Sequence, residues 1–351
     1  MPPLLLHSLA EFEDIIFPTL ELAGARSLVE VGSEEGTFTR VLAAWAERHD
    51  GKVFCVEPEP TAPLLELCAM SPIVQLVKDL SLGALETIDP ADAYFLDGDH
   101  NHYTVSHELE TIDRRAREAG RSWVAILHDV GWPSGRRDMY YAPDTLPAEA
   151  VHSHTWDEGV LVGEDQPVEG GFRGEGSFAW ARHEGGPANG VLTAVEDFLA
   201  ERDDLVYVHV PCVFGLGIIY PATADYAPEL SEFLRWYDRN ALLDRLEQNR
   251  VALYLRVIEL QDEHRDLASE LEQSMLRNRD LHVENRALWA RTAELEAELE
   301  GIRRHRDLLA TETGHLVKSR AFSLAERISK VLGGARPLSR QRLRDALNAG
   351  P

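Results

Sequence analysis

The chain has 351 residues, and its 60 Asp and Glu against 35 Lys and Arg give a formal charge of −25. This balance argues against a nucleic-acid-binding protein, because binding a phosphate backbone depends on clustered basic side chains. Three scattered cysteines (Cys55, Cys68 and Cys212) are too few for a disulfide framework or a four-cysteine zinc site, which favours the cytoplasm. We expect no secretory signal and no membrane span, because the first residues lack a basic region and no apolar stretch is long enough.

The chain divides into two parts of different composition. Sixteen of the 18 prolines lie at or before Pro228, and none lies between Glu229 and Arg336. Residues 1–235 carry 15 basic and 41 acidic side chains, whereas residues 236–351 carry 20 and 19. We therefore predict a helical lead-in over residues 1–19, an acidic domain over residues 20–235 and a nearly neutral second part.

The acidic domain alternates between predicted strands and helices. Its predicted strands, in chain order, are 26–31, 52–56, 93–96 and 123–127, and its clearest helices are 37–48 and 103–119. Two later strands, 205–210 and 213–220, are close enough to pair as an antiparallel hairpin. This alternation predicts an α/β fold with helices on the faces of a sheet.

The turn after the first predicted strand favours a cofactor without phosphate groups. It reads Glu30-Val-Gly32-Ser33-Glu-Glu-Gly36, and glycine there lets a ligand approach the helix that follows. Glu57 ends the next strand, where an acidic side chain accepts hydrogen bonds from both hydroxyls of a ribose. The spacing is neither that of a dinucleotide motif nor that of a P-loop, and two acidic residues inside the turn would repel a pyrophosphate. We therefore expect an adenosine cofactor with a cationic or zwitterionic group.

These residues resemble the first motif of the class I S-adenosylmethionine-dependent methyltransferases, which consists of an acidic residue, any residue, a glycine, any three residues and a second glycine. Glu30, Gly32 and Gly36 match it, and the resemblance covers about residues 20–220. It implies a Rossmann-like, seven-stranded methyltransferase sheet with a terminal antiparallel hairpin, and S-adenosyl-L-methionine as cofactor. It also implies a set of cofactor-binding residues: Glu30, Gly32, Ser33, Gly36, Glu57, Asp79 and Asp97.

Two predicted strand ends carry acidic and histidine side chains together. Asp97-Gly-Asp-His100 follows one strand and His128-Asp129 follows the next, and ligands of open α/β sheets bind at such ends. Asp97 and Asp129 could share a divalent cation such as Mg²⁺, which would lower the pKa of a bound hydroxyl while a nearby histidine takes its proton. In the alternative interpretation, the two carboxylates only orient the cofactor or cap helices.

This pair of clusters resembles the metal-assisted O-methyltransferases of the mycinamicin and macrocin type, which act on sugars of macrolide antibiotics. Asp97 and His100 match the Asp-x-x-His of that subgroup, which implies a catalytic Asp97 that binds metal and a general base at His100. A structural, hydrogen-bonded role for His100 is the alternative. Asp129 matches the second acid of the subgroup's acidic pair, but His128 replaces the first. The implied ligands Asp97, His128 and Asp129 would therefore take Mg²⁺, Mn²⁺ or another ion, or none.

The segment after Asp129 is rich in aromatic and arginine side chains. Aromatic faces bind the apolar side of a sugar ring and planar charged groups bind its hydroxyls, which makes five residues candidate acceptor contacts: Trp132, Arg136, Arg137, Tyr140 and Tyr141. A loop that packs its aromatic side chains locally is the alternative. The irregular stretch 142–190 is predicted to be a lid or binding loop, or disordered.

The second part predicts a coiled coil over residues 236–319. Leucine or isoleucine occupies ten of eleven positions spaced by seven from Leu246 to Leu316, with Ser274 as the interruption. Four residues after these positions lie Asn278 and Asn285, a pattern that favours a parallel two-stranded coil and hence a homodimer. A helix of this length would extend for roughly 120 Å. The alternative is a helix that bends at Gly301 and Gly314 and folds back into a bundle.

Residues 320–351 form a predicted basic amphipathic tail. Eight basic side chains lie between Lys318 and Asp345, and apolar residues are spread through the first part of this stretch. Such a segment can rest on the anionic inner face of a membrane, dock on an acidic partner or simply be solvated.

The sequence thus favours an S-adenosylmethionine-dependent O-methyltransferase that acts on a hydroxyl of a glycan or glycosylated metabolite, with metal assistance. Two alternatives stay open. One is an assembly protein with a methyltransferase-like binding module, and the other is a metal-independent methyltransferase.

Overall fold

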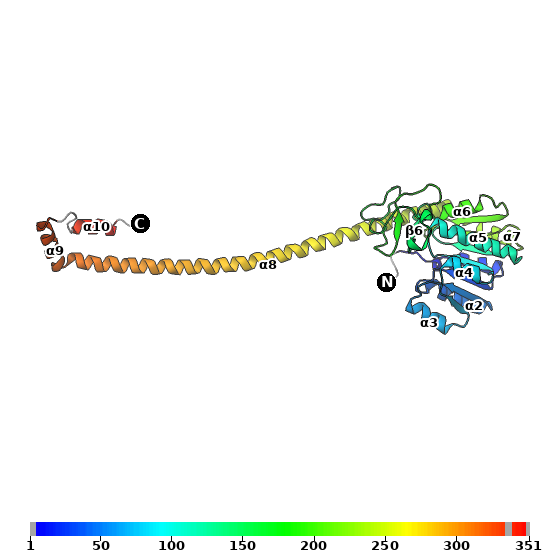
Figure 1. Cartoon of the computed structure of the whole chain (residues 1–351), viewed down its shortest axis with the longest axis horizontal. Coiled ribbons are helices and arrows are strands. Elements are labelled where there is room, and N and C mark those ends of the chain that lie inside the picture. Colours follow the sequence, from blue (N-terminus) through cyan, green and yellow to red (C-terminus); the bar gives the residue numbers. More distant parts are fainter. Residues whose placement is uncertain (1–4, 334–338, 349–351) are drawn as a thin grey trace. The chain divides into compact units, whose positions relative to one another are not determined.

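The computed structural model describes residues 5–333 and 339–348 (Figure 1). Seven of its strands form one mixed sheet. Their order is β3-β2-β1-β4-β5-β10-β9. The strands are β1 (Ser27–Val31), β2 (Lys52–Val56), β3 (Val74–Val77), β4 (Ala93–Leu96), β5 (Val124–Leu127), β9 (Leu205–Val210) and β10 (Leu216–Pro221). The first five are parallel, and β10 runs antiparallel to both β5 and β9. The predicted α/β fold with a terminal antiparallel hairpin is therefore confirmed.

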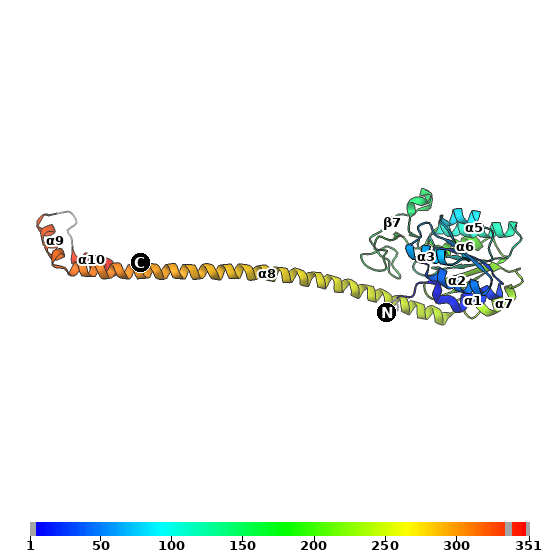
Figure 2. The ribbon, with the colours of Figure 1, turned by 90° about the horizontal axis from the view of Figure 1, so that it is seen from below.

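Helices cover both faces of this sheet (Figure 2). Each face has its own apolar core. One core packs against α1 (Glu13–Leu22), α2 (Thr37–Arg48), α3 (Ala62–Met70) and α7 (Ala227–Leu234). The other packs against α4 (Ser81–Thr87), α5 (His102–Glu118) and α6 (Val191–Leu199). The central strands β1, β4 and β5 are buried along their whole length, which explains their continuous apolar runs.

Much of the stretch predicted as a lid is ordered. It contains two short 3₁₀ turns, Pro143–Thr145 and Ala148–Ala150, and most of a second sheet of order β6-β8-β7. The strands of that sheet are β6 (Met139–Tyr140), β7 (His154–Thr155) and β8 (Ala179–Ala181), which pack around Met139, Val160 and Trp180. A third 3₁₀ turn, Leu9–Phe12, precedes α1 within the predicted helical lead-in.

The chain forms two compact units, Met1–His264 and Arg265–Pro351. The first unit extends beyond residue 235 and includes the first turns of α8 (Ala241–Lys318). The helix α8 is continuous through Gly301 and Gly314, so neither glycine bends the chain back into a bundle. In the second unit α8 is followed by α9 (Arg320–Val331) and α10 (Arg340–Asn348).

The apolar side chains of α9 are largely exposed, with Leu324 at 61% and Val331 at 86%. Ser319 caps this helix by accepting a hydrogen bond from the Phe322 amide. The contact of this tail with an anionic surface or an acidic partner stays a prediction. Within the described residues, no helix combines the length and hydropathy needed to cross a membrane.

Candidate functional site

The turn between β1 and α2 brings the backbone of two strand ends unusually close together. Gly32 has φ +82°, and a Cβ placed on it would lie 2.2 Å from the carbonyl oxygen of Asp97. Gly36 has φ +79° and stands directly before α2, with its amide donating to the Ser33 carbonyl at 2.7 Å. Only glycine fits at position 32, because both its backbone angle and the adjoining β4 strand end exclude a side chain.

The acidic residue of the motif is turned into the protein. Glu30 is 2% exposed and accepts hydrogen bonds from the hydroxyls of Thr39 (2.6 Å) and Ser33 (3.1 Å). Burial raises the pKa of Glu30 to about 7, although both hydroxyls lower it. The Ser33 hydroxyl also contacts Cys55 Sγ at 2.8 Å, so this network joins β1, β2 and α2. Thr39 and Cys55 were not singled out by the sequence, since neither belongs to a recognisable motif.

Glu57 directly follows β2, as expected, and Asp79 lies two residues after β3, a strand that the sequence did not predict. Glu57 accepts the amide protons of Glu34 (3.3 Å) and Glu59 (3.1 Å), which ties its strand end to the glycine turn. Asp79 accepts the amide proton of Leu80 at 2.8 Å, directly before α4. Neither residue, nor Gly36, is part of the cavity described below.

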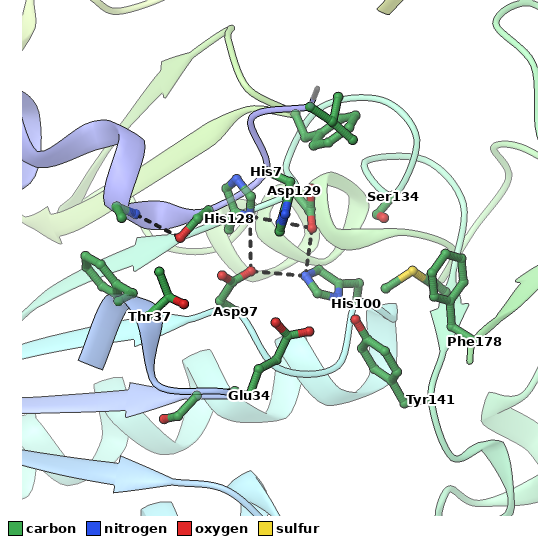
Figure 3. Close-up of a pocket in the computed structure, with 18 of the residues that line it drawn as sticks. His7, Glu34, Thr37, Asp97, His100, His128, Asp129, Ser134, Tyr141 and Phe178 are labelled. Carbon is green, nitrogen blue, oxygen red and sulfur yellow. Dashed lines mark hydrogen bonds and ion pairs between the residues drawn. The ribbon is translucent and has the colours of Figure 1, made fainter. Parts of the chain in front are cut away.

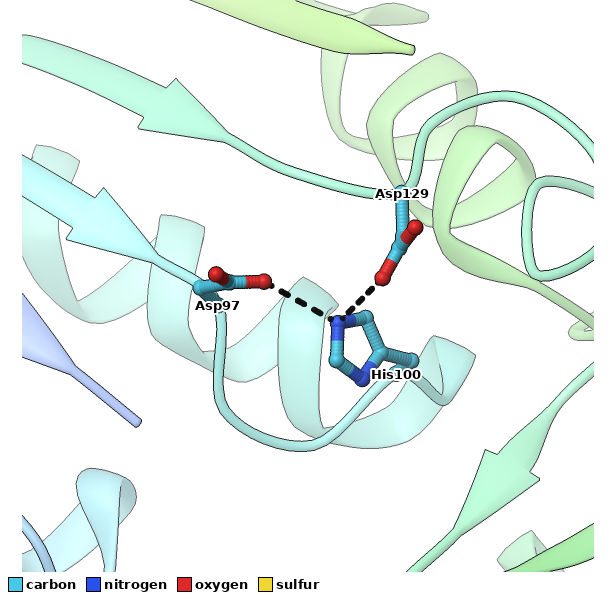
Figure 4. Close-up of side chains that lie close together, drawn as sticks. All are labelled: Asp97, His100 and Asp129. Atoms are coloured by element: carbon cyan, nitrogen blue, oxygen red, sulfur yellow. Dashed lines mark hydrogen bonds and ion pairs between the residues drawn. The ribbon is translucent and has the colours of Figure 1, made fainter. Parts of the chain in front are cut away.

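Asp97, His100, His128 and Asp129 come together at the carboxyl ends of β4 and β5 (Figure 3). His100 Nε2 lies 2.8 Å from Asp129 Oδ2 and 3.3 Å from Asp97 Oδ1 (Figure 4). His128 Nδ1 lies 3.1 Å from Asp97 Oδ1 and 3.6 Å from Asp129 Oδ2. Asp129 adopts φ +58°, a strained conformation for a residue with a side chain. One nitrogen of each histidine therefore faces the same two carboxylates.

The side chains of this cluster stabilise one another in their charged forms, although burial disfavours charge. Burial by itself disfavours the imidazolium of His128, but Asp129 and Asp97 outweigh it and raise the pKa to about 9. The same two carboxylates raise the pKa of His100 well above its ordinary value. Burial would raise the pKa of Asp97, yet His128 and His100 lower it to about 2. Two carboxylates that attract two protons in this way would also attract a cation.

The residues present fit a divalent metal ion. Ligand atoms of Asp97, His100 and Asp129 all lie within 4.8 Å of one another, so these three residues could hold one ion. His128 offers a fourth donor, because its Nε2 lies 3.0 Å from the Val213 carbonyl oxygen and therefore carries the proton. In the neutral ring, Nδ1 then presents its lone pair to the carboxylates. The two carboxylates suit Mg²⁺ or Mn²⁺, whereas the imidazole nitrogens favour a transition-metal ion over Mg²⁺, which prefers oxygen ligands.

A cavity of about 600 Å³ opens beside this cluster and the glycine turn, within the usual size range of a small-molecule site. The predicted residues that line it are Glu30, Gly32, Ser33, Asp97, His100, His128, Asp129 and Tyr141. Its wall also includes Glu34 and the aromatic side chains Phe172, Phe178 and Trp180, which sequence reasoning missed. The three aromatic residues could have been found from the sequence, because they form a cluster near the end of the predicted lid.

Four of the five predicted acceptor contacts are not in the cavity lining. Arg137 is 1% exposed and donates to the backbone carbonyls of Ala181, Glu164 and Asp165. Tyr140 is fully buried, and its hydroxyl donates to Asp138.

The other two lie nearer to the surface. Arg136 forms a two-bond ion pair with Glu196, both at 2.6 Å, and Trp132 packs against Phe172. Composition could not show which of these side chains point inward.

Residues 29–130 match the family model of a methyltransferase domain. The comparison with curated proteins finds no match. Solved structures with a similar fold include a Bacillus cereus O-methyltransferase in complex with SAH, which is 14% identical and has a TM-score of 0.37 over 62% of this chain and 84% of that one. The O-methyltransferase TomG from Streptomyces achromogenes, involved in tomaymycin synthesis and in complex with SAM, is 18% identical, with a TM-score of 0.36 and coverages of 63% and 83%. The SAH-bound Podospora anserina methyltransferase PaMTH1 is 14% identical, with a TM-score of 0.38 and coverages of 62% and 80%. This part of the chain is therefore similar to a methyltransferase domain.

Proposed function

We propose that the chain is an S-adenosylmethionine-dependent methyltransferase and that it methylates a hydroxyl of a glycan or glycosylated metabolite with the help of a divalent metal ion. The observation that carries this proposal is the cluster of Asp97, His100, His128 and Asp129 beside the glycine turn. Paired carboxylates and histidines at this place can bind a cation that lowers the pKa of a hydroxyl and can accept its proton, and both operations favour methylation of an unactivated hydroxyl.

The acidic surroundings of the turn suit the cofactor. Glu34 and Asp97 line the same cavity, and burial and the nearby Asp97 carboxylate raise the pKa of Glu34. A positively charged sulfonium or amino group would relieve this repulsion between acids, whereas a pyrophosphate would add to it. The close approach of Gly32 to the β4 strand end keeps the turn flat against the sheet and open to a ligand.

We assign His128 to the metal and His100 to the proton. His128 is held from behind by the Val213 carbonyl, which is the kind of outer contact that orients metal-binding histidines. His100 Nδ1 is buried without a hydrogen-bond partner, so its ring is held only through Nε2, the nitrogen that would accept the proton. A divalent ion bound by Asp97, Asp129 and His128 would lower the pKa of an acceptor hydroxyl. With both carboxylates engaged by the ion, the neutral His100 Nε2 would accept the hydroxyl proton as the oxygen attacks the methyl group of S-adenosylmethionine, whose methyl–sulfur bond breaks to release S-adenosylhomocysteine.

The aromatic wall supports a sugar-containing acceptor. Tyr141 lies 6.2 Å from the His100 ring, between ring centroids, and packs edge-on against Phe178. Phe178 in turn packs edge-on against Trp180 at 5.2 Å. These faces offer apolar area beside the proposed base, which is what the C–H face of a pyranose needs.

The proposal is tested in two stages. Calorimetry should show binding of S-adenosylmethionine, and transfer of a labelled methyl group should be measured over a panel of methyl glycosides and glycosylated metabolites with Mg²⁺ or Mn²⁺. We expect activity that EDTA removes and that Asp97→Asn lowers by at least about 100-fold. The control variant Asp89→Asn, at an exposed position, should retain full activity.

Three outcomes would contradict parts of the proposal. Activity that survives EDTA would exclude metal assistance. Transfer to a nitrogen or carboxylate acceptor but to no hydroxyl would exclude the O-methyltransferase. Cofactor binding with no transfer across the panel would favour a non-catalytic binding module.

A further inference from the structure

The long helix α8 presents an apolar row that its own chain leaves exposed. In the second unit the row consists of Leu267, Leu281, Leu288, Leu295, Ile302, Leu309 and Leu316. Each of these side chains is between 48% and 67% exposed. A helix of 78 residues gains most of its stability from packing such a row against a partner rather than from its own backbone hydrogen bonds.

The polar residues beside this row indicate what the partner is. Asn278 and Asn285 lie four residues after positions 274 and 281 of the heptad series, on the inner edge of the row. In a parallel coiled coil each asparagine faces its own copy, and the two amides satisfy one another. Against a different helix they would be left among apolar side chains without partners, which is costly.

The charges that flank the row agree with this arrangement. In a parallel pair, the residues that lie three positions after each row residue flank the interface. Each of them lies near the residue of the partner whose number is five higher. This places Arg291 near the partner subunit's Glu296, and Glu298 near the partner subunit's Arg303. Arg291 pairs with Glu294 of its own helix at 2.9 Å, but both side chains are more than 60% exposed, so this pair holds Arg291 only weakly. From Glu263 to His305, no charged flanking residue lies near a partner residue that carries a full charge of the same sign.

We propose that the row from Leu267 to Leu316 is the interface of a parallel, in-register dimer with a second copy of this chain. The interface is independent of the proposed enzymatic function, because it includes no residue of the candidate site.

The test is the mass of the full chain in solution, measured by light scattering or sedimentation equilibrium. We expect a dimer at micromolar concentration and a monomer for the double variant Leu288→Arg, Leu295→Arg. The matched control is Ala290→Arg, Ala297→Arg, which adds the same charge on the outward face of the same turns and should remain dimeric. Circular dichroism and cofactor binding show whether both variants keep the folded first unit.

Orientation has its own measurement. Asn285→Cys should form a disulfide-linked dimer on mild oxidation, above any background that the unmodified chain gives through its three cysteines. A monomeric wild-type chain, or a Leu288→Arg, Leu295→Arg variant that stays dimeric, would overturn the proposal. If Asn285→Cys is dimeric but gains no disulfide link between its two copies, the parallel, in-register arrangement is wrong.

A second inference comes from the opposite end of α8, within the first unit. Here Glu247 holds the loop between β9 and β10, since its carboxylate accepts the amide protons of Val213 (3.0 Å) and Phe214 (2.8 Å). Val213 and Phe214 have φ +47° and +63°, conformations that need outside support. Arg250 donates to both Glu247 oxygens at 2.6 Å and lies over the Phe214 ring, which fixes the carboxylate.

The other side of this loop contacts the candidate site. The Val213 carbonyl accepts the proton of His128 Nε2 at 3.0 Å, and the Phe214 carbonyl accepts the amide proton of Gly131 at 2.6 Å. The loop therefore connects Glu247 to the histidine that faces Asp97 and Asp129. No residue of the motifs points to this connection, because Glu247 is more than 100 positions away from His128 in the sequence.

We infer that Glu247 is a positioning residue that sets the orientation and tautomer of His128 through the Val213 carbonyl. This inference deepens the proposed function and rests on it for the metal. Glu247→Gln keeps the size of the side chain but leaves only one oxygen to accept two amide protons.

The test compares Glu247→Gln with Glu259→Gln, an exposed glutamate on the same helix. In nitrogen-15-labelled, metal-free protein, the wild type should show His128 in its Nε2–H form whenever the ring is neutral, and Glu247→Gln should show a mixture of tautomers. Affinity for Mn²⁺, measured by electron paramagnetic resonance, should fall by about 10-fold in Glu247→Gln and stay unchanged in Glu259→Gln. S-adenosylmethionine binding and the melting temperature report whether the fold is intact.

An unchanged His128 signal in Glu247→Gln would overturn the positioning role. An unchanged Mn²⁺ affinity in a variant with altered tautomers would also overturn it. If the wild type binds no Mn²⁺, the metal in the proposed function fails, while the His128 signal still decides the role of Glu247.

Discussion

The two compact units treat the same kind of residue in opposite ways. In the first unit, leucines such as Leu28, Leu42 and Leu109 are completely buried between the sheet and its helices. In the second unit, leucines of α8 such as Leu267 and Leu288 remain more than half exposed. An α/β sheet provides both faces of its own core, whereas a single helix has no second surface to cover its apolar row. The first unit therefore covers its own apolar core, whereas the described residues leave the apolar row of the second unit exposed.

The strongest test of the first unit is the close backbone contact at Gly32. Gly32→Ala should abolish S-adenosylmethionine binding and destabilise the domain by more than about 4 kcal/mol, because the new Cβ would meet the Asp97 carbonyl. Gly24→Ala is the matched control, since Gly24 also has a positive φ but has no atom within 4 Å of a Cβ. It should cost about 1 kcal/mol and leave binding intact. Calorimetry and chemical denaturation measure both effects, and similar losses in the two variants would show that crowding is not the cause.

A buried acid should make the first unit less stable as the pH rises. Glu108 is 2% exposed, and burial raises its pKa to about 8 against 4.5 for an ordinary glutamate, although a hydrogen bond with Ser81 lowers it. Between these values the unfolded chain has lost the proton that the folded chain keeps, so the free energy of unfolding falls as pH rises, by on the order of 4 kcal/mol for a shift of this size.

The comparison variant is Glu108→Gln, which has no proton to lose. Denaturation from pH 5 to pH 8 should show a shallower fall in stability for Glu108→Gln than for the wild type. Parallel curves would mean that Glu108 is ionised in the folded state.

A smaller loss of stability should distinguish the buried Arg137 from the more exposed Arg136. Arg137→Ala should destabilise the domain by about 3 kcal/mol, because it leaves three backbone carbonyls without their donor. Arg136→Ala removes an exposed ion pair with Glu196 and should cost less than about 1 kcal/mol. Urea denaturation measures both. If Arg136→Ala also leaves the affinity for the acceptor unchanged, Arg136 does not contact the acceptor, contrary to what composition suggested.

The smallest expected effect concerns the apolar row of α8. Leu288→Ala and Leu295→Ala should leave the melting temperature of the first unit within about 1 °C of the wild type, because neither side chain belongs to that unit. A large decrease would show that the two units depend on each other for stability.

Several elements of the fold could be predicted closely because their signals are local. The strands 52–56 and 93–96 and the helix 37–48 have the bounds that their apolar patterns predict. The short strand β3 and the helices α3 and α4 were not predicted, since their few apolar residues show no clear period. The small sheet β6-β8-β7 escaped prediction for another reason. Its strands are two or three residues long and pair across stretches of the chain that carry no periodic signal.

The candidate site was predictable where it follows strand ends and unpredictable where it depends on side-chain direction. Asp97 and His128 meet because parallel strands β4 and β5 end at the same edge of the sheet. Arg137 and Tyr140 lie in an equally suggestive segment, yet they turn inward to satisfy buried carbonyls and Asp138.

The sequence by itself determined the division into an acidic α/β domain and a leucine-patterned helix, the glycine turn and the acidic and histidine residues at two strand ends, because periodicity and turn chemistry act over a few residues. Only the tertiary structure decided that His128 is oriented by the β9–β10 loop, that Glu247 supports this loop and that the aromatic wall comes from the segment near Phe178. Those contacts join residues far apart in the chain, and their geometry is fixed by how the sheet, its loops and the start of α8 pack together.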